Sequence, residues 1–339
     1  MRVVSLLPSA TESLCLIGGA SMLVGRSHEC DFPASVAGVP VLTSQAIPAA
    51  LSDAANPQPG AIDAMVREQL ASGQSLYQVD EKLLRELRPD VILTQDLCSV
   101  CSIDLATVRR IVADMTTSEY TPRIVSPSPQ TFEDVLDDVH RVGAAVGLEA
   151  EATAAVVRLR ERVFSASEYV NPFDDGPNVV FLEWTDPLFI GGHWTPQLIE
   201  RAGARHPLNA TVAKESAGAA LGPQVAERVA GKSIRVPKEA VIGVNPDAMV
   251  IAPCGMNLEQ TRACAAALLQ EDWFRALRAV RNGRVALVDG NQYFNRPGPR
   301  LVEAYEFLVG WLNGREEVVP RGFGWEMMKQ EPHARAWGG

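Results

Sequence analysis

The sequence has little of what nucleic-acid-binding and membrane proteins carry. Its 31 Lys and Arg against 41 Asp and Glu give a formal net charge of −10 at pH 7. No excess of positive charge is therefore available to release counterions from phosphates or to dock on an anionic membrane. No apolar run approaches the roughly 18 residues that a spanning helix needs. We expect no nucleic-acid partner and no membrane insertion.

The N-terminus lacks the features of a secretory signal. Residues 1–7 read as a first strand that ends at Pro8, and neither a longer apolar stretch nor a small-residue cleavage site is visible. This absence predicts a cytoplasmic location. The six cysteines are too few for a disulfide scaffold and are more typical of core thiols, metal ligands or reactive groups.

Common catalytic motifs are also missing. The sequence has no Gly-x-Gly-x-x-Gly after a strand, no phosphate-binding loop, no nucleophile elbow and no His-Glu-x-x-His. A thiol hydrolase would pair a cysteine with a histidine, for which His28 or His193 could serve, but no spacing demands it. We assign no catalytic residue, and the balance is against an enzyme.

What the chain does contain is an alternation of short apolar strands and helical patterns. This alternation is the signature of an α/β fold with parallel sheets flanked by helices, and 339 residues suggest roughly two domains. A Pro-Asp pair, a strand and a cysteine follow one another twice, from Pro89 to Cys98 and from Pro246 to Cys254. The repeat predicts two similarly built lobes.

The same pattern divides the chain into an N-terminal lobe (residues 1–130), a helical segment (131–170), a C-terminal lobe (171–314) and a tail (315–339) without periodicity. Within the helical segment, which Gly143 and Gly147 should split, Leu148 to Ser167 has few helix breakers. As a helix it would span about 30 Å, enough to cross a domain. We expect it to join the two lobes.

Capping and turn chemistry predict three local features. Ser9 should cap the first helix, with Glu12 completing a capping box. Thr195 is a good cap for a later helix with Pro196 at its first position. The prolines and small polar residues of 48–60 indicate a loop.

Most of the unusual side chains follow predicted strands. Ligands of open parallel sheets gather beyond the carboxyl ends of the strands, so these positions are candidates for a site. The segments concerned are His28 to Asp31, Cys98 to Cys101, Gly191 to Trp194, Cys254, and Tyr293 to Arg296.

Each candidate also has a plainer interpretation. His28 suits a hydrogen-bonded loop histidine as well as a metal ligand, and Cys98 and Cys101 suit packing as well as function. Trp194 suits a hydrophobic contact at a helix start. Arg296 suits either an anion clamp or a salt bridge.

The cysteines allow a sharper expectation. Cys30, Cys98, Cys101 and Cys254 should converge at the mouth of one cleft, because three strand ends supply them. Together with His28 they could bind a soft metal such as zinc or iron, since thiolate and imidazole favour such ions. The alternative is that each thiol packs within its own lobe.

Several phrases, in this order, resemble a known family. They are Val-Val-Ser-Leu-Leu-Pro-Ser-Ala-Thr-Glu at 3–12, His-Glu-Cys-Asp at 28–31, Ser-Leu-Tyr at 75–77, Asp-Leu-Cys at 96–98 with Cys101, Gly-Gly-His-Trp at 191–194 and Asn-Arg-Pro-Gly-Pro at 295–299. The chain resembles the periplasmic binding proteins for cobalamin, heme and iron siderophores, and most closely their cobalamin-binding-like branch. The resemblance runs to about Leu312.

The resemblance implies two α/β lobes joined by one long helix, with a large metal chelate, classically cobalamin or another corrinoid, in the cleft between them. Aromatic faces would hold this chelate, and Trp184, Trp194 and Tyr293 are suitable. The residues expected at the cleft are Ser9, His28, Glu29, Trp184, His193, Trp194, Tyr293, Asn295 and Arg296.

The chain would then act as a soluble carrier, a sensor or an ABC-importer-type receptor. The missing export signal puts docking on an importer in doubt. The alternative function is that of a thiol- and histidine-based metalloprotein or enzyme that uses the cleft cysteines.

Overall fold

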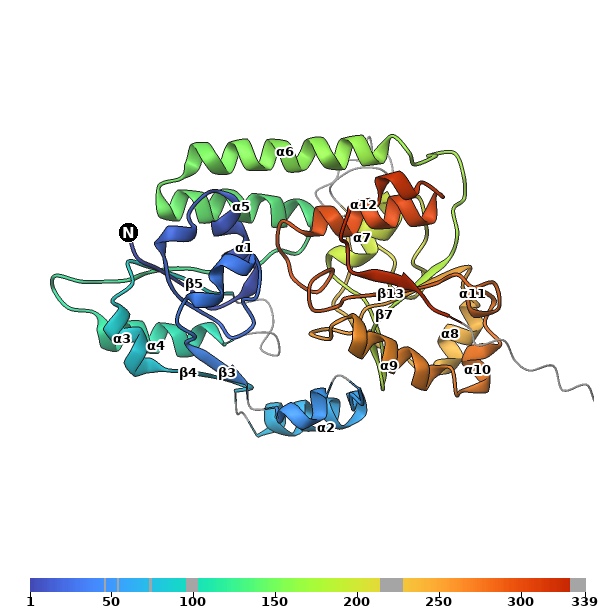
Figure 1. Cartoon of the computed structure of the whole chain (residues 1–339), viewed down its shortest axis with the longest axis horizontal. Helices are drawn as coiled ribbons and strands as arrows, with labels where there is room; N and C mark the ends of the chain where they lie inside the picture. The colour runs from blue at the N-terminus through green and yellow to red at the C-terminus, as the bar shows by residue number, and fades with distance from the viewer. Residues whose placement is uncertain (46, 54, 73–74, 96–102, 214–227, 330–339) are drawn as a thin grey trace, which may run out of the picture.

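The computed structural model describes residues 1–339 except 46, 54, 73–74, 96–102, 214–227 and 330–339. Two α/β lobes lie side by side, and one long helix, α6 (Glu149–Ser167), runs along both of them (Figure 1). The predicted fold class is confirmed. In the described part of the chain, no helix is both long and apolar enough to cross a membrane.

The N-terminal lobe is built on a parallel four-stranded sheet in the order β2-β1-β5-β6. Its strands are β1 (Val3–Ser5), β2 (Leu23–Arg26), β5 (Val91–Leu93) and β6 (Arg123–Val125). Its helices are α1 (Pro8–Leu16), α3 (Glu81–Leu87), α4 (Leu105–Met115) and α5 (Phe132–Val146), with short 3₁₀ turns at Ala20–Met22 and Ala34–Gly38.

A separate hairpin projects from this lobe. It pairs β3 (Thr43–Gln45) with β4 (Tyr77–Val79) in antiparallel register. The chain between them contains a 3₁₀ turn, Ala49–Ser52, and α2 (Pro59–Ala71), and we call residues 47–72, without 54, the arm. The loop expected at 48–60 is thus only partly correct, because Pro59 starts a helix at the first position, where proline is favoured.

The C-terminal lobe has a mixed six-stranded sheet in the order β11-β8-β7-β12-β13-β14, parallel at its centre and antiparallel at both edges. Its strands are β7 (Val179–Thr185), β8 (Leu188–Ile190), β11 (Ile234–Arg235), β12 (Ala248–Ile251), β13 (Val285–Val288) and β14 (Trp325–Met327). A small ladder pairs β9 (Val212–Ala213) with β10 (Arg228–Val229).

Helices cover both faces of this second sheet (Figure 1). They are α7 (Trp194–Arg201), α8 (Lys238–Val244), α9 (Leu258–Leu268), α10 (Asp272–Arg275), α11 (Arg278–Arg281) and α12 (Leu301–Leu312), with 3₁₀ turns at Pro207–Asn209 and Glu316–Val318.

The repeated Pro-Asp phrase has the same geometry in both lobes. In the first, the Asp90 carboxylate accepts the backbone N–H of Arg2, just before β1, at 2.7 Å. In the second, Asp247 accepts the backbone N–H of Asn178, just before β7, at 2.9 Å. Each aspartate therefore ties the start of its own strand to the start of the neighbouring central strand. The carboxyl ends of these strands come to lie together as a result.

The long connector is formed as expected. Thr131 and Asp134 form a capping box at the start of α5, and Gly147, with φ of 72°, ends it before α6 begins. Gly143 does not split the segment but lies inside α5, where a Cβ would come within 2.5 Å of the Ala152 methyl carbon. The missing side chain lets α5 and α6 approach closely.

Both predicted helix caps are wrong. Helix α1 starts at Pro8 with Leu7 as its cap residue, so Ser9 is the second residue of the helix and Glu12 closes no capping box. Proline is pre-organised for the first helical position, which explains the earlier start. Helix α7 starts at Trp194, with His193 rather than Thr195 before it.

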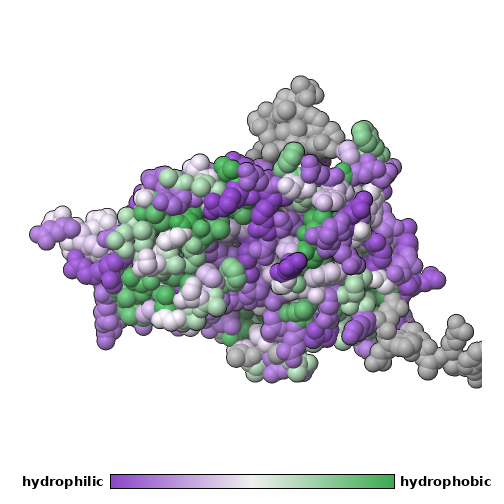
Figure 2. All heavy atoms as spheres, turned by 45° about the horizontal axis from the view of Figure 1, so that its top comes forward, coloured by the Kyte–Doolittle hydropathy of each residue, from purple (hydrophilic) through white to green (hydrophobic). Residues whose placement is uncertain are grey.

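On the face that carries α6, the hydropathy of the surface changes from the N-terminal lobe to the region where the lobes meet (Figure 2). Figure 2 shows hydrophobic side chains gathered over the N-terminal lobe and hydrophilic ones toward the middle. An ion pair between Arg162 of α6 and Glu306 of α12, with nitrogen and oxygen 2.5 Å apart, joins the connector to the C-terminal lobe.

Candidate functional site

The carboxyl ends of the two sheets face each other. Asp31, in the loop after β2, accepts hydrogen bonds from Asn291 at 2.9 Å and Gln292 at 2.8 Å, in the loop after β13. It also pairs with Arg296 at 2.6 and 3.1 Å. These contacts place polar groups from both lobes at one position, as expected for a cleft lined by strand ends.

A buried group of charges lies next to this contact. Glu12, on α1 of the first lobe, is 3% exposed. It accepts two hydrogen bonds from Arg300, at 2.7 and 3.0 Å, and one from Arg296 at 3.3 Å. We call Glu12, Asp31, Arg296 and Arg300 the interlobe ion cluster. Of the two interpretations of Arg296, the structure supports an ion pair, and that pair crosses between the lobes.

Within this cluster, Arg296 and Asp31 stabilise each other's charged forms. Burial alone would lower the pKa of the Arg296 guanidinium, but hydrogen bonds and attraction from Asp31 and Glu12 outweigh burial and raise it. Burial likewise opposes ionisation of Asp31, yet the Arg296 hydrogen bond lowers the pKa of that carboxyl. Removing one partner would leave a buried charge uncompensated, which is strongly destabilising.

Tyr293 contributes to this cluster rather than to an open surface. The Arg300 guanidinium lies 4.0 Å from the ring centre of Phe32 and 5.3 Å from that of Tyr293. The other contact of Tyr293 is with Phe323, whose ring centre is 4.0 Å away. Little of the Tyr293 ring is left to act as a ligand platform.

On the side of the N-terminal lobe, the loop after β2 presents His28 and Glu29. The Tyr77 hydroxyl donates to Glu29 at 2.9 Å, and the Tyr77 ring lies 5.8 Å from the His28 ring. Burial raises the Glu29 pKa, although Tyr77 and Arg296 act against it. Tyr77 therefore joins this part of the site, although we expected no separate role for it from the sequence.

One ring nitrogen of His28, Nε2, forms no hydrogen bond with the described residues. Its Nδ1 lies 2.7 Å from the hydroxyl oxygen of Thr43, and that hydroxyl donates its hydrogen to Ser27. Nδ1 is therefore the donor, which leaves Nε2 unprotonated. Nε2 is buried and has no hydrogen-bond partner among the described residues. Burial, helped by Arg26, lowers the His28 pKa and favours the neutral ring.

Two aromatic residues expected at the cleft lie elsewhere or are covered. Trp194 is 5% exposed, packs in the core and donates its indole N–H to the Phe294 carbonyl at 2.5 Å. Its rings are not available to a ligand. Trp184, at the end of β7, is half-buried and donates to the carbonyl of Pro59, in the arm, at 3.2 Å.

The remaining predicted residues have mainly structural contacts. His193 stacks on Trp194 with ring centres 5.5 Å apart, and burial lowers its pKa. Asn295 donates to the carbonyls of Ala252 and Gly290 and so ties together the loops after β12 and β13. Ser9 packs closely against Gly298, where a Cβ would lie 3.2 Å from the Ser9 Cα.

The expected cysteine cluster can be followed only in part, because Cys98 and Cys101 lie outside the described residues. Cys30 is fully buried and accepts a hydrogen bond from Thr11 at 3.1 Å. Burial raises its pKa to about 11, so in the metal-free protein it is a neutral thiol at physiological pH. Cys254 is half-buried. Within the described ranges, no three His, Cys, Asp or Glu side chains are grouped to hold a metal ion.

Two important residues were missed from the sequence. Glu12 was interpreted as part of a helix cap, and Arg300 was not considered. The available signals were Glu12, which is the one charged residue of Pro8–Leu16, and two arginines four residues apart, Arg296 and Arg300. Neither signal says that these residues meet across 288 positions of sequence.

Comparison with known proteins agrees with this geometry. A family model described as "Periplasmic binding protein" matches residues 3–291. A search of curated proteins finds no match. Solved structures with a similar fold include a periplasmic heme binding protein from Pseudomonas aeruginosa, at 20% identity over 92% of each chain and a TM-score of 0.64. Another is the periplasmic vitamin B12 binding protein BtuF of Vibrio cholerae, at 16% identity over 93% of this chain and 98% of that one, with a TM-score of 0.61.

A third similar structure is a possible iron-binding, periplasmic solute-binding protein from Staphylococcus epidermidis, at 20% identity over 94% of this chain and 98% of that one, with a TM-score of 0.62. The family match contradicts the cytoplasmic location expected from the N-terminus, because the family is one of periplasmic binding proteins. An N-terminus without a recognisable signal does not by itself fix the compartment.

Proposed function

The chain belongs to the periplasmic binding protein family, and from this premise we propose that it binds a small metal chelate between its two lobes. Cobalamin or a related corrinoid is the first candidate, on the sequence phrases shared with the cobalamin-binding-like branch. Heme and iron chelates are the competing ligands of the same class. We further propose that the protein passes its ligand to an ABC importer.

The observation that carries this proposal is the meeting of strand ends from both lobes at Asp31 and Arg296. A ligand at this place would touch both lobes at once. Next to it, His28 offers an unprotonated Nε2 without a partner among the described residues. Neutral imidazole is a common ligand of iron and other transition metals. His28 would be the residue that holds the chelated metal, and its neutral imidazole would supply a nitrogen ligand.

The alternative of a metalloprotein or enzyme based on the cleft thiols is less well supported. It needs thiolates, and burial keeps Cys30 protonated at neutral pH. The four-cysteine cluster remains a prediction, since Cys98 and Cys101 lie outside the described residues.

Titration of the purified protein with cyanocobalamin, hemin and a ferric siderophore tests the proposal. We expect a 1:1 complex with cyanocobalamin, a shifted visible band and quenched tryptophan fluorescence. Binding of hemin or the siderophore alone would keep the class of ligand and replace the corrinoid. No response to any of the three would overturn the proposed function.

A further inference from the structure

The arm connects the two lobes on the side away from α6. It leaves the N-terminal lobe at β3 and returns at β4, and α2 lies below the space between the lobes in Figure 1, opposite α6. It packs against the N-terminal core through Val66 and forms hydrogen bonds with the C-terminal lobe. Gln260 of α9 donates to the Ser52 carbonyl at 2.5 Å, and Trp184 of β7 donates to the Pro59 carbonyl at 3.2 Å.

The arm packs on a small apolar cluster that shares Val66 with the edge of the N-terminal core. Ile62 of the arm, Met256 and Cys264 form its buried centre. The partly buried residues around that centre are Ile47, Leu51, Val66 and Trp184. Met256 and Trp184 lie at the carboxyl ends of β12 and β7, where a ligand of the cleft is expected. The arm therefore covers the carboxyl ends of β7 and β12.

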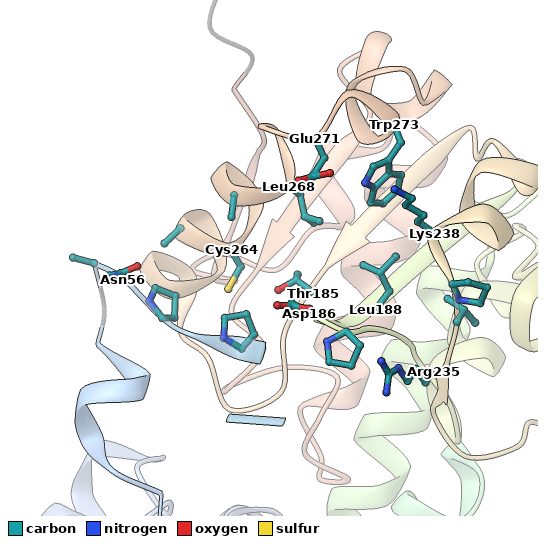
Figure 3. A pocket seen from close by; sticks show the side chains of 18 residues that line it. Asn56, Thr185, Asp186, Leu188, Arg235, Lys238, Cys264, Leu268, Glu271 and Trp273 are labelled. Carbon is teal, nitrogen blue, oxygen red and sulfur yellow. The ribbon is translucent and has the colours of Figure 1, made fainter. Parts of the chain in front are cut away.

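Few residues of the arm are buried in this contact. Of the thirteen residues of α2, only Ile62 is fully buried. Beside this cluster, a cavity of about 900 Å³ lies between residues 55–59 of the arm and the C-terminal lobe. Figure 3 shows Asn56 on one side of this cavity, with Cys264, Asp186 and Trp273 around the rest of it. A segment with few buried apolar contacts opens locally at a lower free energy than the whole fold.

The lobes, in contrast, are held firmly to each other. The connector α6 contacts α5 on one side and α12 on the other, and the interlobe ion cluster joins α1 to the loop after β13. A large hinge opening of the lobes would have to break buried ion pairs. Among the described residues, release of the arm breaks the Gln260–Ser52 hydrogen bond, the longer of two hydrogen bonds of the Trp184 indole, and one small apolar cluster.

We infer that the arm is a lid, and that a chelate reaches the cleft when the arm leaves the C-terminal lobe while the lobes stay together. The inference rests on the proposed function for the identity of the ligand, but the opening of the arm is a property of the ligand-free protein. The two can therefore be tested separately.

A reversible cross-link provides the test. A Cβ built on Gly60 lies 3.2 Å from the Asp186 Cγ, close to where the sulfur of a cysteine at 186 would be. This proximity suits a disulfide, whose Cβ atoms are about 3.5–4.5 Å apart. The double variant Gly60→Cys/Asp186→Cys should lock the arm when oxidised, with cross-linking checked by peptide mapping. The two single variants are the controls.

Two measurements test the opening of the arm and the binding of the ligand separately. One is the rate at which hydrogen peroxide oxidises Met256 in the ligand-free protein, followed by mass spectrometry. The other is the association rate of cyanocobalamin and hemin, followed by stopped-flow absorbance. We expect both rates to be at least about tenfold lower in the locked protein than in the single variants, since opening of the arm limits both.

Equal Met256 oxidation rates in locked and unlocked protein would overturn the lid. Slower oxidation on locking, with no chelate bound by any form, would leave the lid in place and overturn the proposed function. If the cross-link does not form, the variant Ile62→Ala tests the lid instead. It weakens the apolar cluster under the arm, so Met256 oxidation and chelate association should both become several-fold faster. The matched control is Leu70→Ala, at an exposed position of the same helix. No difference between Ile62→Ala and Leu70→Ala would also contradict the lid.

Discussion

Glu12 and Arg300 form a two-pronged ion pair between the lobes, with nitrogen–oxygen distances of 2.7 and 3.0 Å. Both residues are buried, and they are 288 positions apart in the sequence. Arg296 adds a third hydrogen bond to the same carboxylate. Because the pair joins α1 to the start of α12, it links the relative position of the lobes to the stability of the fold.

Replacing Glu12 by Gln should therefore destabilise the protein strongly. The change leaves two buried guanidinium groups without their shared carboxylate, and loss of one partner of a buried pair costs about 3–5 kcal/mol. Urea unfolding of the variant measures this loss. The control is Glu326→Gln, which removes an exposed partner of Arg262 and should cost less than about 1 kcal/mol. Similar losses in both variants would show that the cluster does not carry this stability.

The lobes should move little when a ligand binds. The α6 connector and the interlobe ion cluster leave no free hinge between them. Small-angle scattering profiles with and without a bound chelate should nearly coincide, with a change in radius of gyration below about 1 Å rather than the larger change of a hinge closure. A contraction of several ångströms would contradict this expectation.

Asp138, on α5, should make the stability depend on pH. One carboxylate oxygen pairs with Arg141 at 2.5 Å, while the other is buried with no partner among the described residues. Burial raises the Asp138 pKa from 3.8 to about 6, with Arg141 acting against the rise. The folded state therefore holds a proton that the unfolded state loses, so stability falls as the pH rises from about 4 through about 6.

Asp138→Asn removes this penalty. We expect the variant to be more stable than the parent by about 1–2 kcal/mol at pH 8, less than the full linkage because the Arg141 pair is lost. The gain should shrink toward pH 4. Urea unfolding at both pH values measures it, with Asp137→Asn on the exposed side of the same helix as control. A gain that is the same at both pH values would exclude Asp138 as its source.

Much of the architecture could be predicted because it is written in local patterns. The strand Val285–Val288 and the connector Glu149–Ser167 follow from apolar runs and helix formers within a few residues. The duplicated Pro-Asp phrase indicated two similar lobes for the same reason. Asp90 and Asp247 perform the same backbone task in each.

The features that depend on contacts distant in sequence could not be predicted. Strand β14 has three residues in a tail without periodicity, and it is defined only by pairing with β13. Ile62 is one of several apolar residues in α2, and the sequence does not indicate that it is the one that packs on Met256. Trp194 looked like a ligand platform because its sequence position follows a strand, yet helix α7 turns it into the core.

Binding of the chelate should depend on the protonation state of His28. Burial and Arg26 lower its pKa below the ordinary 6.5, so the ring is neutral at pH 7 and Nε2 can coordinate a metal. Affinity should then be constant above pH 6.5 and fall by up to about tenfold per pH unit below the lowered pKa, because the proton competes with the metal.

His28→Ala should weaken binding and abolish this dependence, whereas His140→Ala on α5 should change neither. Measurement of the dissociation constant for hemin and for cyanocobalamin between pH 4.5 and 8 decides the matter. An unchanged pH profile in His28→Ala would mean that another group holds the metal.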